Sequence, residues 1–299
     1  MEKMYYLCSV KPLILRGRPL KARPDMKNIV VRAASGIVYV ALIVGSILGG
    51  PTWFLGLTVL FGILATVELQ KVIGICFDSW TDILCLLLDM TMVTVMSLCA
   101  YAGPLYLVAG LPAALALYFL ARGVLALYDR RPHPFRNVAW SFMSVFYPGL
   151  PLMTLDMLYN DSLPASKWLV LIMFVMIWLN DTGAYCFGST LGRHRMFPRL
   201  SPKKSWEGFA GGLLCCLLTG WACSAWFNDL GWPLWTWLLA GAAVCAFATW
   251  GDLFESMLKR NAGVKDSGSI IPGHGGILDR IDSLLFVSPA ILILYLCIN

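Results

Sequence analysis

The sequence predicts an all-α polytopic integral membrane protein, because the chain is too apolar for a soluble fold and its apolar residues occur in long stretches. Of the 299 residues, 59% are hydrophobic and only 13% are charged, and the mean hydropathy is +0.72. Soluble globular proteins are about 45–50% apolar and about 25% charged. A chain with this composition is expected to expose most of its surface to lipid.

Apolar stretches of about 17 to 25 residues, the length that crosses a bilayer as a helix, recur along the chain. They lie at residues 30–48, 51–67, 82–102, 104–121, 138–154, 168–187, 207–227, 232–250 and 282–298. Glycine and proline within them do not argue against helices, because transmembrane helices tolerate both. No stretch has a strand pattern. We therefore expect about nine transmembrane helices.

The basic residues predict the orientation of these helices. With nine spans, the segment before the first stretch and the loops after the second, fourth, sixth and eighth lie on one side of the membrane. All but one of the 23 lysines and arginines lie there, Lys167 being the exception. Because base-rich loops stay in the cytoplasm, we expect a multi-pass protein of the inner (cytoplasmic) membrane, with a cytoplasmic N-terminus and an external C-terminus.

The first 25 residues are distinct from the rest of the chain. They are basic, and they lack both a signal-peptide apolar region and a cleavage-site pattern. Met26 then opens a second plausible start, MKNIVVRAASG. We interpret residues 1–25 as a basic surface tail or an extension upstream of the start, and residues 26–299 as a single transmembrane domain.

Charge is concentrated in two cytoplasmic segments, residues 178–208 and 251–283, which we predict to be the catalytic elements. In the second segment, Asp279 and Asp282 are three residues apart at the start of the last apolar stretch. A helix that begins there places both carboxylates on one face. The alternative is that acids at a helix start only cap it and interact with its dipole.

A second polar stripe ends the eighth apolar stretch. Asp252, Ser256 and Lys259 recur at helical spacing and therefore share one face. Carboxylates together with phosphate oxygens are ligands that Mg²⁺ prefers. This pattern predicts a metal site formed by Asp252, Asp279 and Asp282.

Bases and glycines surround these acids. Lys259, Arg260, Lys265 and Arg280 flank the turn-forming sequence PGHGG, which contains His274 and whose glycines let backbone amides approach an anion. This composition is typical of phosphate binding, although neither GxxxxGK[ST] nor GxGxxG occurs. The alternatives are that the bases set topology or face lipid headgroups, and that His274 is only a turn residue.

The first charged segment opens with WLNDTGAY, which places Asn180 and Asp181 at the end of an apolar stretch. An ionisable residue at membrane depth is costly and indicates a functional role. The alternative is that the helix ends at Leu179 and that Asp181 lies in water.

The same segment continues to SPKKSWEG, which supplies two more bases. We expect Lys203 and Lys204 to follow a turn at Pro202, and Ser205 with Gly208 to open the next helix.

Three ordered motifs resemble the phosphatidate cytidylyltransferases, also called CDP-diacylglycerol synthases. The signature residues of that family are matched by Ser256, Lys259, Arg260, Lys265, Asp266, Gly268, Pro272, His274, Gly275, Gly276, Asp279, Arg280 and Asp282. DTGAY and SPKKSWEG are similar to two further family segments in the same order, so the resemblance covers the last part of the chain by motif and the rest by hydropathy. Ser189 departs from the pattern, since relatives commonly carry Arg there.

The resemblance implies a membrane enzyme that joins CTP to phosphatidate, makes CDP-diacylglycerol and releases pyrophosphate. It also implies a need for Mg²⁺, with one or two bound cations, and a homodimer in the lipid bilayer. Both substrates are anions, so a metal and Lys or Arg side chains at the membrane surface are the expected means of overcoming their repulsion. No nucleic-acid partner is expected.

Residue roles are assigned from the motifs and this resemblance. Cations are assigned to Asp252, Asp279 and Asp282, and the catalytic group to Asp279, Asp282, Lys259, Lys265 and His274. The remaining polar residues are assigned to substrate binding: Ser256, Arg260, Arg280, Lys203, Lys204, Ser201 and Asp181.

Two other functions fit parts of the pattern. A related cytidylyltransferase could act on another lipid phosphate, such as an ether or prenyl lipid, because nothing in the charged segments reads acyl chains. A transporter is the non-enzyme alternative, given the polar residues at helix ends. Against it, no inverted repeat relates the two halves, and the charge lies on one side only.

Overall fold

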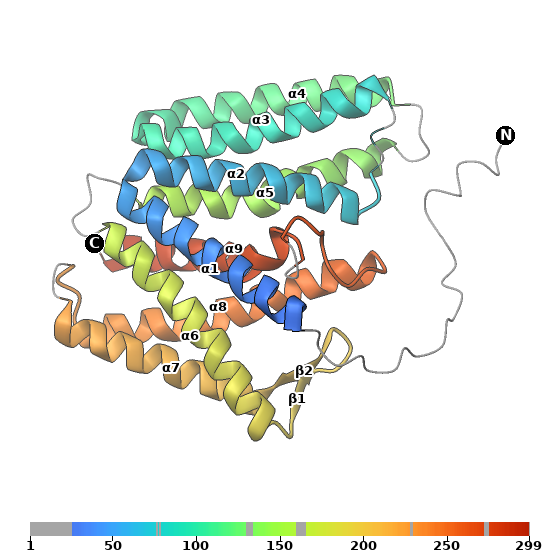
Figure 1. The fold of residues 1–299 in the computed structure, drawn as a ribbon. Coiled ribbons are helices and arrows are strands. Elements are labelled where there is room, and N and C mark those ends of the chain that lie inside the picture. The colour runs from blue at the N-terminus through green and yellow to red at the C-terminus, as the bar shows by residue number, and fades with distance from the viewer. Residues whose placement is uncertain are drawn as a thin grey trace, which may run out of the picture.

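The chain folds into a bundle of long helices with one small hairpin (Figure 1). The computed structural model describes residues 26–75, 77, 79–129, 134–159, 166–227, 230–271 and 275–298. Within these ranges, eight helices are long and apolar enough to cross a membrane, and the first helix contains a shorter apolar run, Ala33–Gly49. The predicted all-α polytopic membrane fold is therefore confirmed. The tail at residues 1–25 and His274 lie outside the described residues.

Each predicted apolar stretch corresponds to one helix. The elements are α1 (Met26–Gly49), α2 (Pro51–Val72), α3 (Trp80–Ala102), η1 (Tyr106–Gly110), α4 (Leu111–Leu127), α5 (Pro134–Leu158), α6 (Ser166–Thr190), β1 (Arg195–Phe197), β2 (Ser201–Ser205), α7 (Trp206–Trp226), α8 (Leu234–Asn261) and α9 (Leu278–Ile298). The π-helical turn η1 leads directly into α4, and the two form one span. Helix α8 continues well beyond the predicted apolar stretch, as the helical spacing of Asp252, Ser256 and Lys259 predicts.

The helices are arranged in layers. Figure 1 shows α3 and α4 along one side, α2 and α5 next to them, and α6 and α7 on the opposite side. Helices α8 and α9 pack along each other between these groups, and α9 also contacts α5 and α2. The last helix is thus surrounded by elements from both halves of the chain.

Two apolar clusters hold the bundle together. The larger one joins α2, α5, α6, α8 and α9 and includes the fully buried Leu69, Trp237 and Leu285, and the smaller one joins α3, α4 and α5 around Tyr118. Helix α4 leaves large apolar side chains exposed, among them Leu117. Exposed apolar side chains on a transmembrane helix are expected to face lipid.

A short antiparallel hairpin links α6 to α7. The sequence did not predict this hairpin, because no stretch has a strand pattern. Strand β1 pairs with β2 through Arg195 with Ser205 and Phe197 with Ser201. Pro202 lies within β2, so the turn predicted there is wrong, and the chain reverses at residues 198–200 instead. Proline is compatible with an edge strand because it removes only one donor from the ladder.

Two local predictions near the hairpin can be compared with the structure. Ser205 caps α7, and its hydroxyl accepts a hydrogen bond from the N–H of Gly208 at 3.2 Å, as predicted. Helix α6 runs on to Thr190, so the alternative in which it ends at Leu179 is wrong. Asp181 is therefore held on a continuous helix.

Candidate active site

The charged side chains gather where α8 ends and α9 begins. The two helices cross closely at Gly251, where an added Cβ would lie 2.6 Å from the carbonyl oxygen of Asp282 and 3.2 Å from the Cα of Ser283. Only glycine permits so close an approach of two backbones. Asp252, the next residue of α8, is consequently held near Asp282 of α9.

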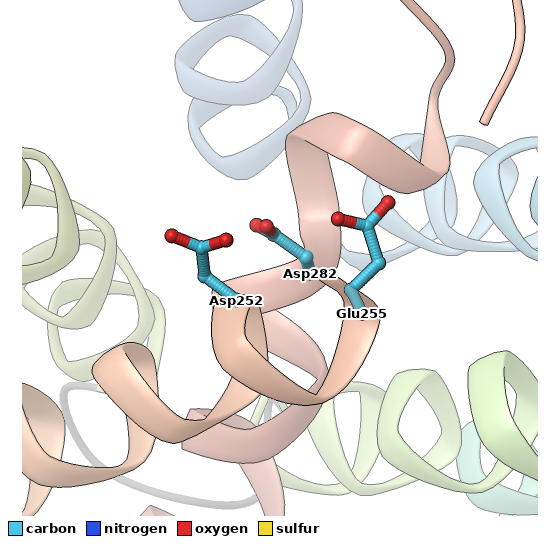
Figure 2. Close-up of side chains that lie close together, drawn as sticks. All are labelled: Asp252, Glu255 and Asp282. Atoms are coloured by element: carbon cyan, nitrogen blue, oxygen red, sulfur yellow. The ribbon is translucent and has the colours of Figure 1, made fainter. Parts of the chain in front are cut away.

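Three carboxylates meet at this crossing. Asp252, Glu255 and Asp282 each offer an oxygen within 4.8 Å of the others. Figure 2 shows Asp252 and Glu255 on successive turns of α8, with the carboxyl group of Asp282 between them. We call these three residues the acid cluster. Sequence reasoning missed Glu255, although its position three residues after Asp252 and four before Lys259 places it on the same helical stripe.

Glu255 is the most enclosed member of the acid cluster. Its side chain is 0% exposed, and its Oε1 has no hydrogen-bond partner, whereas Oε2 pairs with a lysine. Among the described residues, the base that pairs with it is Lys259, whose Nζ lies 2.5 Å from Oε2. A buried carboxylate with an unused oxygen is costly unless another group occupies that position.

Lys259 joins the acid cluster to Asp279. Its Nζ lies 2.6 Å from Oδ1 of Asp279 as well as near Glu255. The other oxygen of Asp279 accepts hydrogen bonds from the backbone N–H groups of Ser267 at 3.0 Å and Gly276 at 2.9 Å. Asp279 thus contacts Lys259 and the α8–α9 connection, beside the acid cluster.

The hairpin brings a second lysine to the cluster. Lys204 Nζ lies 2.7 Å from Oδ2 of Asp252 and donates to the carbonyl oxygen of Thr249 at 3.1 Å. Ser256 donates a hydrogen bond of 3.3 Å to the other oxygen of Asp252. The two charged segments at residues 178–208 and 251–283 therefore meet at one place.

A cavity of about 210 Å³ adjoins the acid cluster. Its lining combines the charged Asp181, Asp279, Arg280 and Asp282 with apolar side chains, which include Val40, Phe174, Ile177, Trp178 and Leu284. Tyr39 of α1 closes one side and donates a hydrogen bond of 3.0 Å to the carbonyl oxygen of Arg280. A cavity lined by both charged and apolar side chains suits a molecule with a polar head and an apolar body.

The remaining predicted bases lie on the surface around the site. Arg260, Lys265, Arg280 and Lys203 are exposed, and no ion pair joins any of them to an acid in the described part of the chain. Arg260 donates to the carbonyl oxygen of Val264 at 3.0 Å. Ser201 begins β2 and is half-buried. These bases are thus open to an anionic ligand.

The acid cluster has the chemistry of a divalent-cation site. Lys204 and Lys259 offset the charges of Asp252 and Glu255, whereas no described base forms an ion pair with Asp282. All the ligand atoms are carboxylate oxygens, which Mg²⁺ and similar hard cations prefer. The unpaired Oε1 of Glu255 agrees with this, so the residues present fit a metal ion.

Comparison with known proteins was made over the whole chain. The family model described as "Cytidylyltransferase family" matches residues 30–298. A phosphatidate cytidylyltransferase of Staphylococcus aureus (strain COL) is 35% identical over 264 residues, covering 88% of this chain and 98% of the relative. One of Staphylococcus epidermidis (strain RP62A) is 37% identical over 232 residues, covering 78% and 86%.

These matches extend far beyond the charged motifs. They cover the apolar helices that position the acid cluster as well as the cluster itself. A match of this extent reflects a shared fold and not only a shared signature. This chain belongs to the cytidylyltransferase family.

Proposed function

We propose that this protein is a phosphatidate cytidylyltransferase, which transfers the cytidylyl group of CTP to phosphatidate and releases pyrophosphate. The observation that carries the proposal is the acid cluster beside a cavity lined by both charged and apolar side chains. The names of the relatives from Staphylococcus support the same activity. The product would be CDP-diacylglycerol.

We assign the metal to the acid cluster. Asp252, Glu255 and Asp282 would hold Mg²⁺, which would stabilise the charge that develops on the transferred phosphoryl group. Asp279, predicted from its motif as a further ligand, bonds to Lys259 and to two backbone N–H groups. Its proposed role is to hold Lys259 and the α8–α9 connection in place. If a second cation binds, Asp279 would be a ligand of that cation.

The lysines and arginines would neutralise the two anionic substrates. Lys259 offsets Glu255 and Asp279, and the exposed Lys265, Arg260 and Arg280 would bind phosphate oxygens. Lys203 and Lys204 would contribute from the hairpin. Holding both phosphates beside the acid cluster lowers the barrier by orienting the lipid oxygen toward the α-phosphorus.

A strong general base is not required for this reaction. The phosphate of phosphatidate is already ionised at neutral pH, so an oxygen is free to attack. The bond from that oxygen to the α-phosphorus of CTP forms as the bond to pyrophosphate breaks. His274 keeps its proposed role of orienting a phosphate group.

The cavity provides a place for the lipid headgroup region. Its apolar lining, which includes Phe174 and Trp178, would contact the glycerol and upper acyl chains, and Asp181 and Arg280 would contact the polar part. Ser201, at the start of β2, keeps its proposed role in substrate binding. Other lipid phosphates also combine a phosphate head with an apolar body. The lipid that accepts the cytidylyl group is therefore identified by assay.

The membrane placement follows the distribution of the bases. We propose an inner-membrane protein with the acid cluster facing the cytoplasm, where CTP is found. The side that carries all bases but Lys167 is the side of the acid cluster. A homodimer is proposed from the family resemblance.

An assay of the purified protein in detergent micelles tests the proposal. Dioleoyl phosphatidate, labelled CTP and Mg²⁺ should yield CDP-lipid and pyrophosphate in equal amounts, and EDTA should abolish both until Mg²⁺ is restored. Ether-lipid and prenyl phosphates serve as competing acceptors. Pyrophosphate without CDP-lipid would mean that the acceptor is wrong, and no product with any lipid phosphate would overturn the proposal.

A further inference from the structure

A buried glutamate on α2 contacts the connection between α8 and α9 from the other side of the bundle. Glu68 is 2% exposed, although it lies about 200 residues away from that connection in the sequence. Its Oε1 accepts a hydrogen bond from the N–H of Ile277 at 3.0 Å. Its Oε2 accepts from the N–H of Leu278 at 2.8 Å and from the hydroxyl of Ser267 at 3.2 Å.

All three donors belong to one short part of the chain. Ile277 and Leu278 lead into α9, whose first N–H groups have no partner within the helix, and Ser267 lies in the preceding connection. A carboxylate at a helix N-terminus is stabilised by those N–H groups and by the helix dipole. Among the described residues no base forms an ion pair with Glu68, and these three hydrogen bonds offset the cost of its burial.

The connection is shaped to admit this carboxylate. An added Cβ at Gly268 would lie 2.6 Å from Oε1 of Glu68, and one at Gly276 would also clash with Glu68. Both positions are therefore restricted to glycine while Glu68 stays in place. The backbone thus approaches the carboxylate closely on the side where the hydrogen bonds form.

A continuous set of contacts leads from Glu68 to the acid cluster. Ser267, which donates its hydroxyl to Glu68, donates its backbone N–H to Asp279. Asp279 pairs with Lys259, and Lys259 pairs with Glu255. In the described part of the chain, no hydrogen bond or ion pair joins Glu68 directly to the acid cluster.

We propose that Glu68 is a positioning residue for the reaction, which holds the α8–α9 connection and, through Asp279 and Lys259, the acid cluster in their working arrangement. The inference rests on the proposed function for its catalytic consequence, but the structural consequence does not depend on it. Groups that orient metal ligands typically change metal affinity or activity by about 10- to 100-fold when they are replaced.

The test compares Glu68→Gln and Glu68→Ala with the wild-type protein. Gln keeps the length of the side chain but presents an NH₂ donor in place of one acceptor, and Ala removes both acceptors. We expect kcat to fall about 10- to 100-fold and the half-saturating Mg²⁺ concentration to rise. The loss with Gln should be smaller than with Ala.

A readout without substrates follows the connection directly. Lys265 is exposed within it, so trypsin cleavage after Lys265 reports how firmly the segment is held. We expect cleavage in the Glu68 variants to be about tenfold faster or more, while cleavage after the exposed Arg199 of the hairpin stays unchanged. Peptide mass spectrometry separates the two sites.

Thr58→Val is the matched control, because Thr58 is also buried on α2 and its hydroxyl donates to Asp156 at 2.8 Å. Its kcat, Mg²⁺ requirement and cleavage after Lys265 should stay within about twofold of wild type. Equal losses in Thr58→Val would overturn the proposal in favour of general destabilisation, as would failure of both Glu68 variants to fold.

Wild-type kcat and wild-type cleavage in Glu68→Gln and Glu68→Ala would also overturn the proposal. If the wild-type protein makes no CDP-lipid, the proposed function fails, and the cleavage comparison alone then decides whether Glu68 holds the connection.

Discussion

At the scale of single residues, two members of the acid cluster pair with lysines that come from two different elements. Lys204 reaches Asp252 from the hairpin, and Lys259 reaches Glu255 from one turn further along α8. No described base forms an ion pair with Asp282, which also lines the cavity. The net negative charge that remains next to the cavity favours a cation at the place where anionic substrates are proposed to bind.

Asp252→Asn and Asp282→Asn are each expected to lower kcat by about 100-fold or more. A metal ion supplies several kcal/mol of charge stabilisation, and about 1.4 kcal/mol corresponds to a factor of ten in rate. CDP-lipid formation is measured over a range of Mg²⁺ concentrations. Asp82→Asn, at the capping box of α3, is the control and should stay near wild type. Near-wild-type rates in both cluster variants would remove them from the metal site.

Lys259→Met is expected to destabilise the protein as well as inactivate it, because it leaves Glu255 and Asp279 without their shared cation. Removing one partner of a buried ion pair costs about 3–5 kcal/mol. The double variant Lys259→Met/Glu255→Gln should lose less stability than the sum of the single variants. Thermal unfolding in detergent measures the loss of stability in each variant. Strictly additive losses would contradict the coupling between Lys259 and Glu255.

At the scale of elements, the crossing of α8 and α9 decides whether the site exists. The crossing depends on Gly251, where the two backbones approach each other. The polar residues of α8 reach the start of α9 because α8 continues past its apolar part to Asn261. The hairpin then closes the site from the α6–α7 side (Figure 1). The carboxylates meet where α8 packs on α9, and the hairpin must pack there as well to bring Lys204 to them.

Gly251→Ala is expected to cost about 1–3 kcal/mol of stability and most of the activity, since the added methyl group meets the backbone of α9. Gly123→Ala on α4 is the matched control, because nothing lies within 4 Å of the Cβ that it adds. Thermal midpoints and CDP-lipid formation are compared for both. Equal behaviour of the two variants would mean that α8 and α9 can separate without loss.

At the scale of the whole molecule, the layered bundle places all the predicted chemistry at one end. Helices α2 and α8 end there, α9 begins there, and the hairpin lies at the same end (Figure 1). Glu68 near the end of α2 contacts the segment that leads into α9. The first and last parts of the chain therefore form a single site.

The proposed orientation is tested with cysteine reporters. Arg199→Cys in the hairpin and Lys167→Cys near the start of α6 are exposed and lie at opposite ends of the spans. In spheroplasts, a membrane-impermeant thiol reagent should label Lys167→Cys without permeabilisation and Arg199→Cys only after permeabilisation. Labelling of each variant is compared with labelling of the wild-type protein. The reverse pattern would invert the topology.

A variant that begins at Met26 is expected to retain full activity. The match to the family begins at residue 30 and the apolar run of α1 at Ala33, so residues 1–25 precede the region shared with the family. CDP-lipid formation and expression level are compared with the full chain. Loss of activity in well-expressed protein would show that the tail is required.

Much of this protein follows from local properties of its sequence. Long apolar stretches determine the helices because the bilayer leaves backbone groups no other partners. Helical spacing of Asp252, Ser256 and Lys259 determines that α8 continues into the polar region, and Ser205 determines where α7 begins. The motifs at residues 178–208 and 251–283 identify the family without any knowledge of packing.

The tertiary structure decided which side chains meet. Glu255 joins Asp252 and Asp282 because α8 and α9 cross at Gly251, whereas Asp279 turns toward Lys259 and two backbone N–H groups. Glu68 contacts residues about 200 positions away, which no spacing along the chain encodes. Propensity and periodicity report on neighbours within one helix, while the partners of a buried carboxylate depend on how several helices pack.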